Sequence, residues 1–317
     1  MILFSYDKNY ISKRASELNF VRDTLEKAYR LADILEYLNT NPLLKVSLAL
    51  KGGTAINLTI FNLPRLSVDI DLDFLKPVRK EEMLQQREMI NNDILKYMES
   101  SGYSLNPRSK TTYSLDSKIF DYINLGGNKD NIKIEINYSM RNHVLVPQEA
   151  PIIAEPFKDK YLINCLNPIE IFASKINALL TRTAARDLYD VYNMVKFEIF
   201  NEGEYTLLRK CIVFYKAIST RNIDTNFDIS TIDKLTQHKI RTDLQPVIRN
   251  RENLDLAKAK ITTKKFIKNL MKLTANEQLF LTRFANKDYK PELLFDDHAI
   301  LERVKKHPMA LWKIQQK

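Results

Sequence analysis

Cysteine, glycine and tryptophan are scarce in this chain, whose 317 residues include two cysteines, six glycines and one tryptophan. Cys165 and Cys211 lie far apart without Cys-x-x-Cys spacing, which excludes a disulfide framework and a zinc ribbon. No apolar run approaches the ~18 residues of a membrane span, and Asp7 interrupts the N-terminus before a signal-peptide core can form. We therefore expect a cytoplasmic protein without disulfides and without a membrane anchor.

Negative charge is also in short supply. The chain has 49 Lys+Arg against 39 Asp+Glu, a formal net charge of +10. Hydrophobic residues make up 44% and charged residues 28%, which are values of a folded globular protein and exclude a disordered one. The excess of positive charge favours a polyanionic partner such as RNA or DNA, although a solvated basic surface has the same composition.

The first half of the chain mixes helix and strand patterns. Apolar residues recur at spacings of three and four over 18–38 and 83–98, which predicts two amphipathic helices. A short helical segment is expected from about Ala55. Strand patterns cover residues 46–50, 66–74, 113–125 and 132–138. The sequence GGNKDN separates the last two strands and predicts a hairpin turn, so Gly126 and Gly127 are expected to be turn glycines.

From Asn167 onward the patterns are almost exclusively helical. Asn167 has the position of an N-cap, Pro168 that of the first helical residue and Glu170 that of the capping-box partner. The layout predicts an α+β domain over residues 1–160, followed by a helical domain over 161–317.

Three carboxylates share one face of the strand LSVDIDLDF, because Asp69, Asp71 and Asp73 alternate with apolar residues. Carboxylates so close together repel one another unless a cation or solvent offsets their charge, and paired divalent ions are the usual device of phosphoryl transfer. A solvent-facing acidic edge strand would show the same alternation.

Two of the few glycines stand together between a predicted strand and a predicted helix. In that order, Gly52, Gly53 and Thr54 would present backbone N–H groups, a helix N-terminus and a hydroxyl to an anion. Neither GxxxxGK[ST] nor GxGxxG is present, which excludes a P-loop and a dinucleotide-binding fingerprint.

These motifs resemble a known family. LKGGTAINLTIFNLPRLSVDIDLDF is similar to the signature of polymerase-beta-type nucleotidyltransferases. R-x-S-x-D-I-D-L resembles the AbiEii/AbiGii toxin family, which includes the MenT-like toxins. KIEINYS, the helical K-x-x-A-x-x-x-R with the following R-D-x-x-D, and the closing segment from KPELLF resemble further blocks, so that the resemblance spans about residues 45 to 312. It implies a polymerase-beta-type core with a mixed sheet, followed by an α-helical C-terminal domain.

The resemblance also implies roles for individual residues. Two Mg²⁺ ions would be held by Asp69, Asp71 and Glu135, the last standing where the wider superfamily often has Asp. The NTP would contact Gly52, Gly53, Thr54, Arg65, Lys175, Arg182 and Arg186. Asp187 would fix Lys175 or Arg182 in place, whereas parts for Asp73 and Asp190 stay open. We expect a regulatory role for Ser67, since its phosphorylation would add negative charge beside the acidic strand.

Spacing supports a cationic patch on the second half. Lys175, Arg182 and Arg186 stand at i, i+7 and i+11, which places them on one helical face if the helix does not break. A solvated face with ordinary surface salt bridges is the alternative interpretation.

The last fifth of the chain is the most basic. Six lysines and no acid lie between residues 258 and 272: Lys258, Lys260, Lys264, Lys265, Lys268 and Lys272. Such a row would bind RNA phosphates, although it would also serve as a solubilising face.

Together with the resemblance, these features lead us to expect an enzyme. It would be an Mg²⁺-dependent nucleotidyltransferase toxin of a toxin–antitoxin or phage-defence system. It would transfer nucleotides from NTP to RNA, the tRNA 3′ end first of all, and so block translation. A cognate antitoxin would be encoded nearby. The alternatives are nucleotidyl transfer to a protein or small molecule, and a catalytically silent module that binds RNA or an antitoxin.

Overall fold

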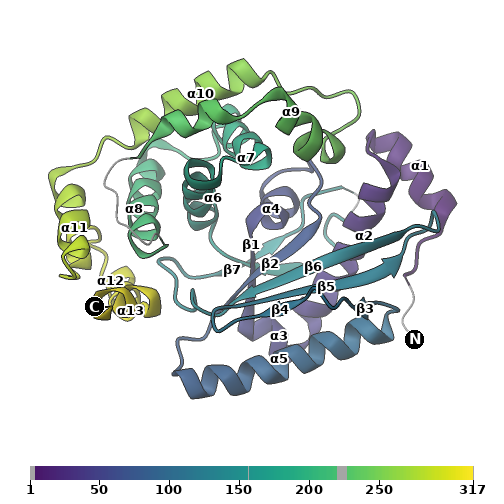
Figure 1. Ribbon diagram of the computed structural model, residues 1–317, viewed down its shortest axis with the longest axis horizontal. Coiled ribbons are helices and arrows are strands. Elements are labelled where there is room, and N and C mark those ends of the chain that lie inside the picture. Colours follow the sequence, from purple (N-terminus) through teal and green to yellow (C-terminus); the bar gives the residue numbers. More distant parts are fainter. Residues whose placement is uncertain (1–3, 156, 220–226, 317) are drawn as a thin grey trace. The chain divides into compact units, whose positions relative to one another are not determined.

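The computed structural model describes residues 4–155, 157–219 and 227–316. The chain divides into two compact units. The first comprises Met1–Arg141, Pro147–Cys165 and Pro246–Glu252, and the second Asn142–Val146, Leu166–Gln245 and Asn253–Lys317. Figure 1 labels their helices and strands. The domain boundary expected at residue 160 stays a prediction.

The first unit combines helices with one mixed sheet, as the sequence predicts. Its helices are α1 (Lys8–Leu18), α2 (Arg22–Thr40), α3 (Pro42–Ser47), α4 (Gly52–Ala55), the π-helix η1 (Ile56–Ile60) and α5 (Lys80–Ser100). Its strands are β1 (Leu48–Lys51), β2 (Asp69–Phe74), β3 (Ser104–Leu105), β4 (Lys110–Thr111), β5 (Leu115–Ile123), β6 (Lys129–Asn137), β7 (Gln148–Pro151) and β8 (Leu162–Cys165).

The strands form one eight-stranded sheet in the order β3-β5-β6-β2-β1-β8-β7, with β4 paired to β5. The central strand β2 is antiparallel to β1 and parallel to β6. The predicted hairpin joins β5 to β6, and Gly127 in its turn has φ +85°. The sheet is therefore mixed, as expected.

The first predicted helix, over 18–38, corresponds to α2, which begins at Arg22, and the helix α1 before it was not predicted. The left-handed residue Asn19 ends α1, so Leu18 and Val21 of the expected stripe lie outside α2. The residues from Leu25 to Leu38 do form a buried stripe on α2. Likewise, the strand expected from Val46 begins only at Leu48, because Pro42 and the side chain of Asn41 start the short helix α3 before it.

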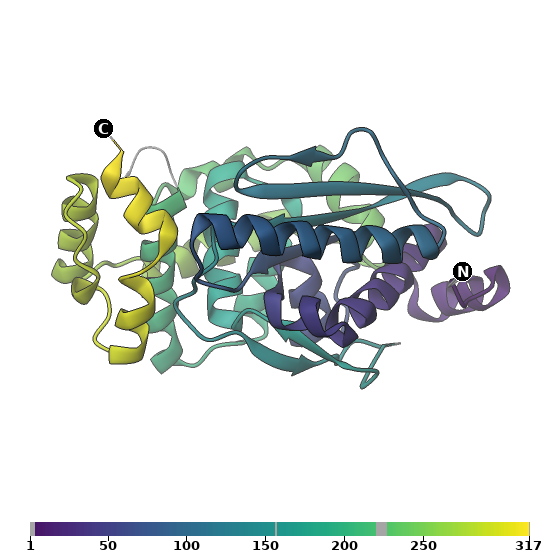
Figure 2. The same cartoon turned by 90° about the horizontal axis from the view of Figure 1, so that it is seen from below.

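One face of the sheet is apolar and covered. Its buried side chains include Ile70, Leu72, Phe120, Ile132, Ile134 and Ile136. Figures 1 and 2 show α5 lying along the sheet. Arg87 of α5 reaches Asp116 of β5, with Nε 2.9 Å from Oδ2, and its Cζ lies 4.7 Å from the ring centroid of Tyr138. Since strand side chains alternate, the carboxylates of β2 lie on the opposite face.

Replacing Arg87 by Met should reduce the free energy of unfolding by about 3–5 kcal/mol, because it leaves the carboxylate of Asp116 buried without its cation. Urea denaturation measures the loss. Lys96→Met on the exposed side of the same helix is the matched control and should change stability by less than about 0.5 kcal/mol. Equal effects of the two substitutions would contradict the assigned role of Arg87.

The pair of Arg87 and Asp116 also makes the free energy of unfolding depend on pH. Burial works to raise the pKa of Asp116, but hydrogen bonds from Arg87, Asn91 and Thr111 outweigh burial and lower that pKa below its ordinary value. The stabilisation is therefore present above pH ~4, the pKa of an unfolded aspartate, and disappears as the pH falls through the lower folded-state pKa. Arg87→Met should remove this part of the acid dependence.

The second unit is helical, as expected. Its elements are α6 (Pro168–Arg182), α7 (Ala185–Lys196), α8 (Glu202–Ser219), η2 (Ile229–Lys234), α9 (Gln237–Lys239), η3 (Ile240–Leu244), α10 (Leu256–Leu270), α11 (Ala275–Ala285), η5 (Pro291–Leu293), α12 (His298–Val304) and α13 (Pro308–Gln315). A short 3-10 turn, η4 (Gln245–Val247), stands where the chain passes between the units. No described helix is long and apolar enough to span a membrane.

Asn167 caps α6 as predicted, but Glu170 is not its capping-box partner. The Asn167 side chain accepts from the N–H of Ile169. Glu170 is buried and accepts from the N–H groups of Val144 and Leu145 instead, at 2.9 Å each. A long-range contact thus replaces the expected local one. It ties the segment Asn142–Val146 to α6.

Candidate active site

The alternation predicted for the acidic strand is present in β2. Ile70 and Leu72 are buried on the covered face, while Asp69 and Asp71 are partly exposed on the other. The carboxylate of Asp71 makes no hydrogen bond or salt bridge within the described parts of the chain. A side chain with that freedom suits an external cation.

Neighbouring strands complete a row of polar residues across the sheet. Asp71 of β2 is the register partner of Glu135 on β6 and of Lys51 on β1, and Glu135 is in turn the partner of Ser117 on β5. Register partners in a sheet present their side chains to the same face about 5 Å apart. The structure thus brings Glu135, the third predicted carboxylate, beside Asp71.

Two lysines of this face were not among the predicted site residues. Lys51 pairs with Asp73, with Nζ 2.6 Å from Oδ1. Although burial opposes the lysine charge, Asp73, Asp71 and Glu135 raise the pKa of Lys51. Lys133 is the register partner of Asp69, and its Nζ lies 3.1 Å from Oε2 of Glu135. The face is therefore a mixed cluster, with Asp73 neutralised by Lys51 inside the fold.

The glycine turn lies beside Asp71 and Arg65. Gly52 has φ +68°, and a Cβ placed on it would lie 2.6 Å from Oδ2 of Asp71. A Cβ on Gly53 would lie 2.5 Å from a guanidinium nitrogen of Arg65. The helix here begins at Gly52 and not near Ala55, so that the glycines form its first turn. Any larger residue at Gly52 would displace the Asp71 side chain.

Thr54 and Ser67 fasten the turn to β2. The buried hydroxyl of Thr54 donates to the carbonyl oxygen of Asp69 and lies 2.8 Å from Oγ of Ser67. Because the Thr54 hydroxyl has a single proton, Ser67 is the donor in the second contact. The Thr54 proton is thus used within the protein, and the predicted phosphate contact of this residue falls to its backbone N–H.

A second cluster of charges lies in the second unit. Lys175 of α6 is buried, with Nζ 3.1 Å from Oδ1 of Asp187 and 3.2 Å from Oδ2 of Asp190. Arg182 binds both carboxylate oxygens of Asp187, with Nε 2.7 Å from Oδ2. Burial works to raise the pKa of Asp187, but Lys175 and Arg182 lower it overall. Asp187 thus holds both cations.

The single helical face expected for three cations is wrong. Thr183, with φ 53°, ends α6 in the left-handed conformation, and α7 begins at Ala185. Arg186 therefore belongs to another helix, and its Nε donates to the carbonyl of Asp243 at 2.8 Å. Lys175 and Arg182 nevertheless meet at Asp187.

Residues 33–285 match the family described as "Nucleotidyl transferase AbiEii toxin, Type IV TA system". The match includes every candidate residue from Gly52 to Lys272. The chain belongs to the AbiEii family. It is therefore a nucleotidyltransferase toxin of a type IV toxin–antitoxin system, which implies an antitoxin partner. The resemblance noted for the segment from Lys290 onward lies beyond the matched residues.

The fold of this AbiEii-family chain agrees with a solved toxin. MenT4, a nucleotidyltransferase toxin from Mycobacterium tuberculosis, is similar with a TM-score of 0.64 and 15% identity, over 97% of this chain and 99% of that one. The Vibrio cholerae cyclic AMP-GMP synthase DncV, solved with nonhydrolyzable GTP, has 11% identity over 92% of this chain and 93% of that one. Its TM-score of 0.21 is too low to support a shared fold. Among curated proteins, none matches. The likeness to MenT4 confirms the α+β nucleotidyltransferase fold.

The six predicted RNA-binding lysines of the AbiEii-family chain are not equivalent. Lys260 donates to the carbonyls of Asp233 and Leu235, and Lys264 pairs with the Asp233 carboxylate at 2.6 Å. These two hold η2 against α10. The other four are exposed: Lys258, Lys265, Lys268 and Lys272.

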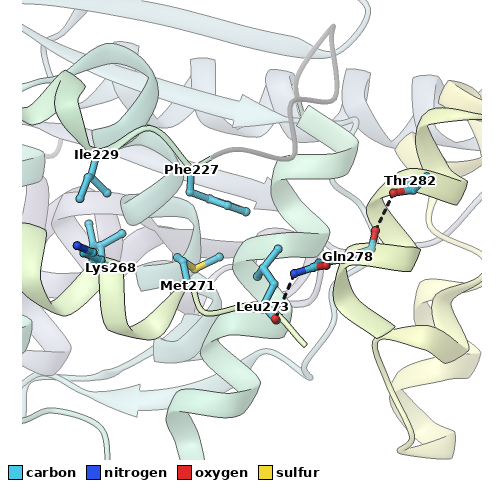
Figure 3. A pocket seen from close by; sticks show the side chains of 8 residues that line it. Phe227, Ile229, Lys268, Met271, Leu273, Gln278 and Thr282 are labelled. Atoms are coloured by element: carbon cyan, nitrogen blue, oxygen red, sulfur yellow. Dashed lines mark hydrogen bonds between the residues drawn. The ribbon is translucent and has the colours of Figure 1, made fainter. Parts of the chain in front are cut away.

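A hollow of about 480 Å³ lies beside this helix, lined by residues that include Phe227, Ile229, Met271 and Leu273. Figure 3 shows their side chains together with Lys268 and with Gln278, which donates to the carbonyl of Leu273. None of the carboxylates of β2 lines it.

The donor chemistry of β2 fits a divalent cation in part. Carboxylates are the ligands that Mg²⁺ prefers, and Asp69 and Asp71 share a face. Within the described residues, however, no three His, Cys, Asp or Glu side chains gather into a metal-binding group. Glu135, the third predicted carboxylate, accepts a hydrogen bond from Lys133.

Proposed function

We propose that this toxin transfers nucleotides from an NTP to the 3′ end of tRNA in an Mg²⁺-dependent reaction and thereby blocks translation. The observation that carries the proposal is the row of Glu135 and Asp71 on one sheet face, directly beside the Gly52 turn. Carboxylates on one face next to the backbone N–H groups of a helix N-terminus suit a metal-bound triphosphate.

The chain's own residues divide the work. Asp69 and Asp71 would hold Mg²⁺, which supplies positive charge against the triphosphate and the departing pyrophosphate. The N–H groups of Gly52, Gly53 and Thr54 begin a helix and are free of intrahelical partners, so they are the phosphate donors. Glu135 would be the third carboxylate of the metal-binding face and would accept the proton of the attacking hydroxyl. The hydroxyl oxygen bonds to the α-phosphorus, and the bond to the β-phosphate breaks.

Cations of the second unit complete the proposal. Lys175 is balanced by two buried carboxylates, whereas the side chain of Arg182 is 64% exposed. Arg182 is therefore the more accessible phosphate contact, with Lys175 and Asp187 fixing its position. The expected parts of Arg65 and Arg186 in NTP binding, and of Ser67 in regulation, stay predictions.

The decisive experiment incubates the purified protein with Mg²⁺, each labelled NTP and total tRNA. Label on the 3′ end of tRNA, lost when EDTA is added, supports the proposal. Label on protein or on a small molecule with none on RNA would establish the alternative acceptor. Tight tRNA binding without any turnover of NTP would contradict transfer and favour a silent binding module.

Basic residues of α10 supply the acceptor surface in this proposal. Replacing Lys265 and Lys268 by Gln should weaken tRNA binding and lower the slope of log K against log salt by about 2, because each lost phosphate contact lowers it by about 1. NTP binding should stay unchanged. The same change at Lys305 and Lys306, which are also exposed, is the control for net charge. Equal slopes for both double variants would contradict this surface.

A further inference from the structure

Lys133 stands inside the carboxylate face. It lies opposite Asp69 in the register of β6 and β2, and two residues from Glu135 on its own strand. Its Nζ is 3.1 Å from Oε2 of Glu135, and the two side chains are 33% and 26% exposed. One of the three carboxylates, that of Glu135, is thus already paired with a solvent-accessible lysine.

Charge explains why the lysine stays there. Asp69, Asp71 and Glu135 present their carboxylates to the same face of the sheet as Lys133. These carboxylates attract its ammonium, which lies 3.1 Å from Oε2 of Glu135.

We propose that Lys133 is a positioning residue that holds Glu135 and must release it before this carboxylate joins a divalent ion. The inference rests on the proposed metal-binding role of the face. The inference predicts the direction in which metal affinity changes, since Lys133 and the metal compete for Glu135. Removing the ammonium should strengthen metal binding, and much more strongly while Glu135 retains its charge.

The test measures Mn²⁺ binding to the full chain without NTP, by titration calorimetry and by the electron paramagnetic resonance of free Mn²⁺. Lys133→Met should bind Mn²⁺ about tenfold more tightly than the unmodified protein, because a positive charge beside the ligands is lost. Lys133→Gln keeps a polar side chain of similar length and should show the same gain. In the Glu135→Gln background, Lys133→Met should add little.

Lys129 provides the matched control. It lies on the same strand and the same face, four residues from Lys133, and is exposed. Lys129→Met removes an equal charge and should leave Mn²⁺ affinity within twofold of that of the unmodified protein.

The results distinguish a failure of the role of Lys133 from a failure of the proposed metal dependence. If the unmodified protein binds Mn²⁺ and Asp71→Asn abolishes binding, but both Lys133 variants match the unmodified protein, the role of Lys133 is overturned and the metal site stands. Weaker binding by both Lys133 variants would also overturn it. If the unmodified protein binds no Mn²⁺, both this inference and the proposed metal dependence fail.

Discussion

Asp71→Asn should lower the rate of nucleotidyl transfer by about 10³-fold while the protein remains folded. The substitution keeps the shape of the side chain and removes only its charge. Asp71 is the central residue of the row that runs from Glu135 to Lys51, and its carboxylate makes no bond that the fold requires. The loss should therefore fall on the transition state, where removal of one preorganised charged group typically costs about this much.

Single-turnover transfer of labelled nucleotide measures the effect, and thermal unfolding verifies the fold. Asp121→Asn is the control: Asp121 lies on β5, next to β6, and accepts from Asn106 at 2.6 Å. It should reduce the rate less than twofold. If the Asp71→Asn enzyme transfers nucleotides within tenfold of the normal rate, the assignment of Asp71 as a ligand or catalytic group is contradicted.

The three aspartates of β2 show which features of the site the sequence predicts and which it does not. Strict alternation predicts that Asp69, Asp71 and Asp73 share a face, and the structure agrees. It does not predict that Asp73 is neutralised, because its cation Lys51 lies on another strand and reaches it only through the antiparallel register of β1 and β2. Asp73 thus differs from its neighbours through a contact between strands.

In the second unit, too, the sequence predicts the local elements but not the contacts between distant residues. Periodicity predicts the helices that contain Lys175 and Asp187, and their meeting was one of the expected contacts. The sequence leaves open whether the helix continues from Lys175 to Arg186, and the position of the break at Thr183 could not be predicted, since a left-handed Thr has no strong sequence signal. The pairing of Lys264 with Asp233 was also missed because it joins residues 31 positions apart. Local patterns predict elements, and long-range contacts decide which charges stay exposed.

Gly52→Ala should lower nucleotidyl transfer by about 100-fold, although it adds a single methyl group. The new Cβ would lie 2.6 Å from Oδ2 and 3.3 Å from Cγ of Asp71, closer than atoms tolerate. The short Asp71 side chain must therefore rotate away from its position beside Glu135. A displacement of about 1 Å in a reacting constellation can cost this much in rate.

The substitution also has a backbone cost, which must be separated from the effect on Asp71. Alanine at φ +68° destabilises the fold by roughly 1–2 kcal/mol whatever surrounds it. Gly127→Ala isolates that cost, since Gly127 has φ +85° and its Cβ would meet nothing within 4 Å. Urea denaturation should show similar losses of stability for both variants, whereas only Gly52→Ala should lose activity. If the two variants lose activity equally, backbone strain alone explains the effect, and the contact between Gly52 and Asp71 has no part in catalysis.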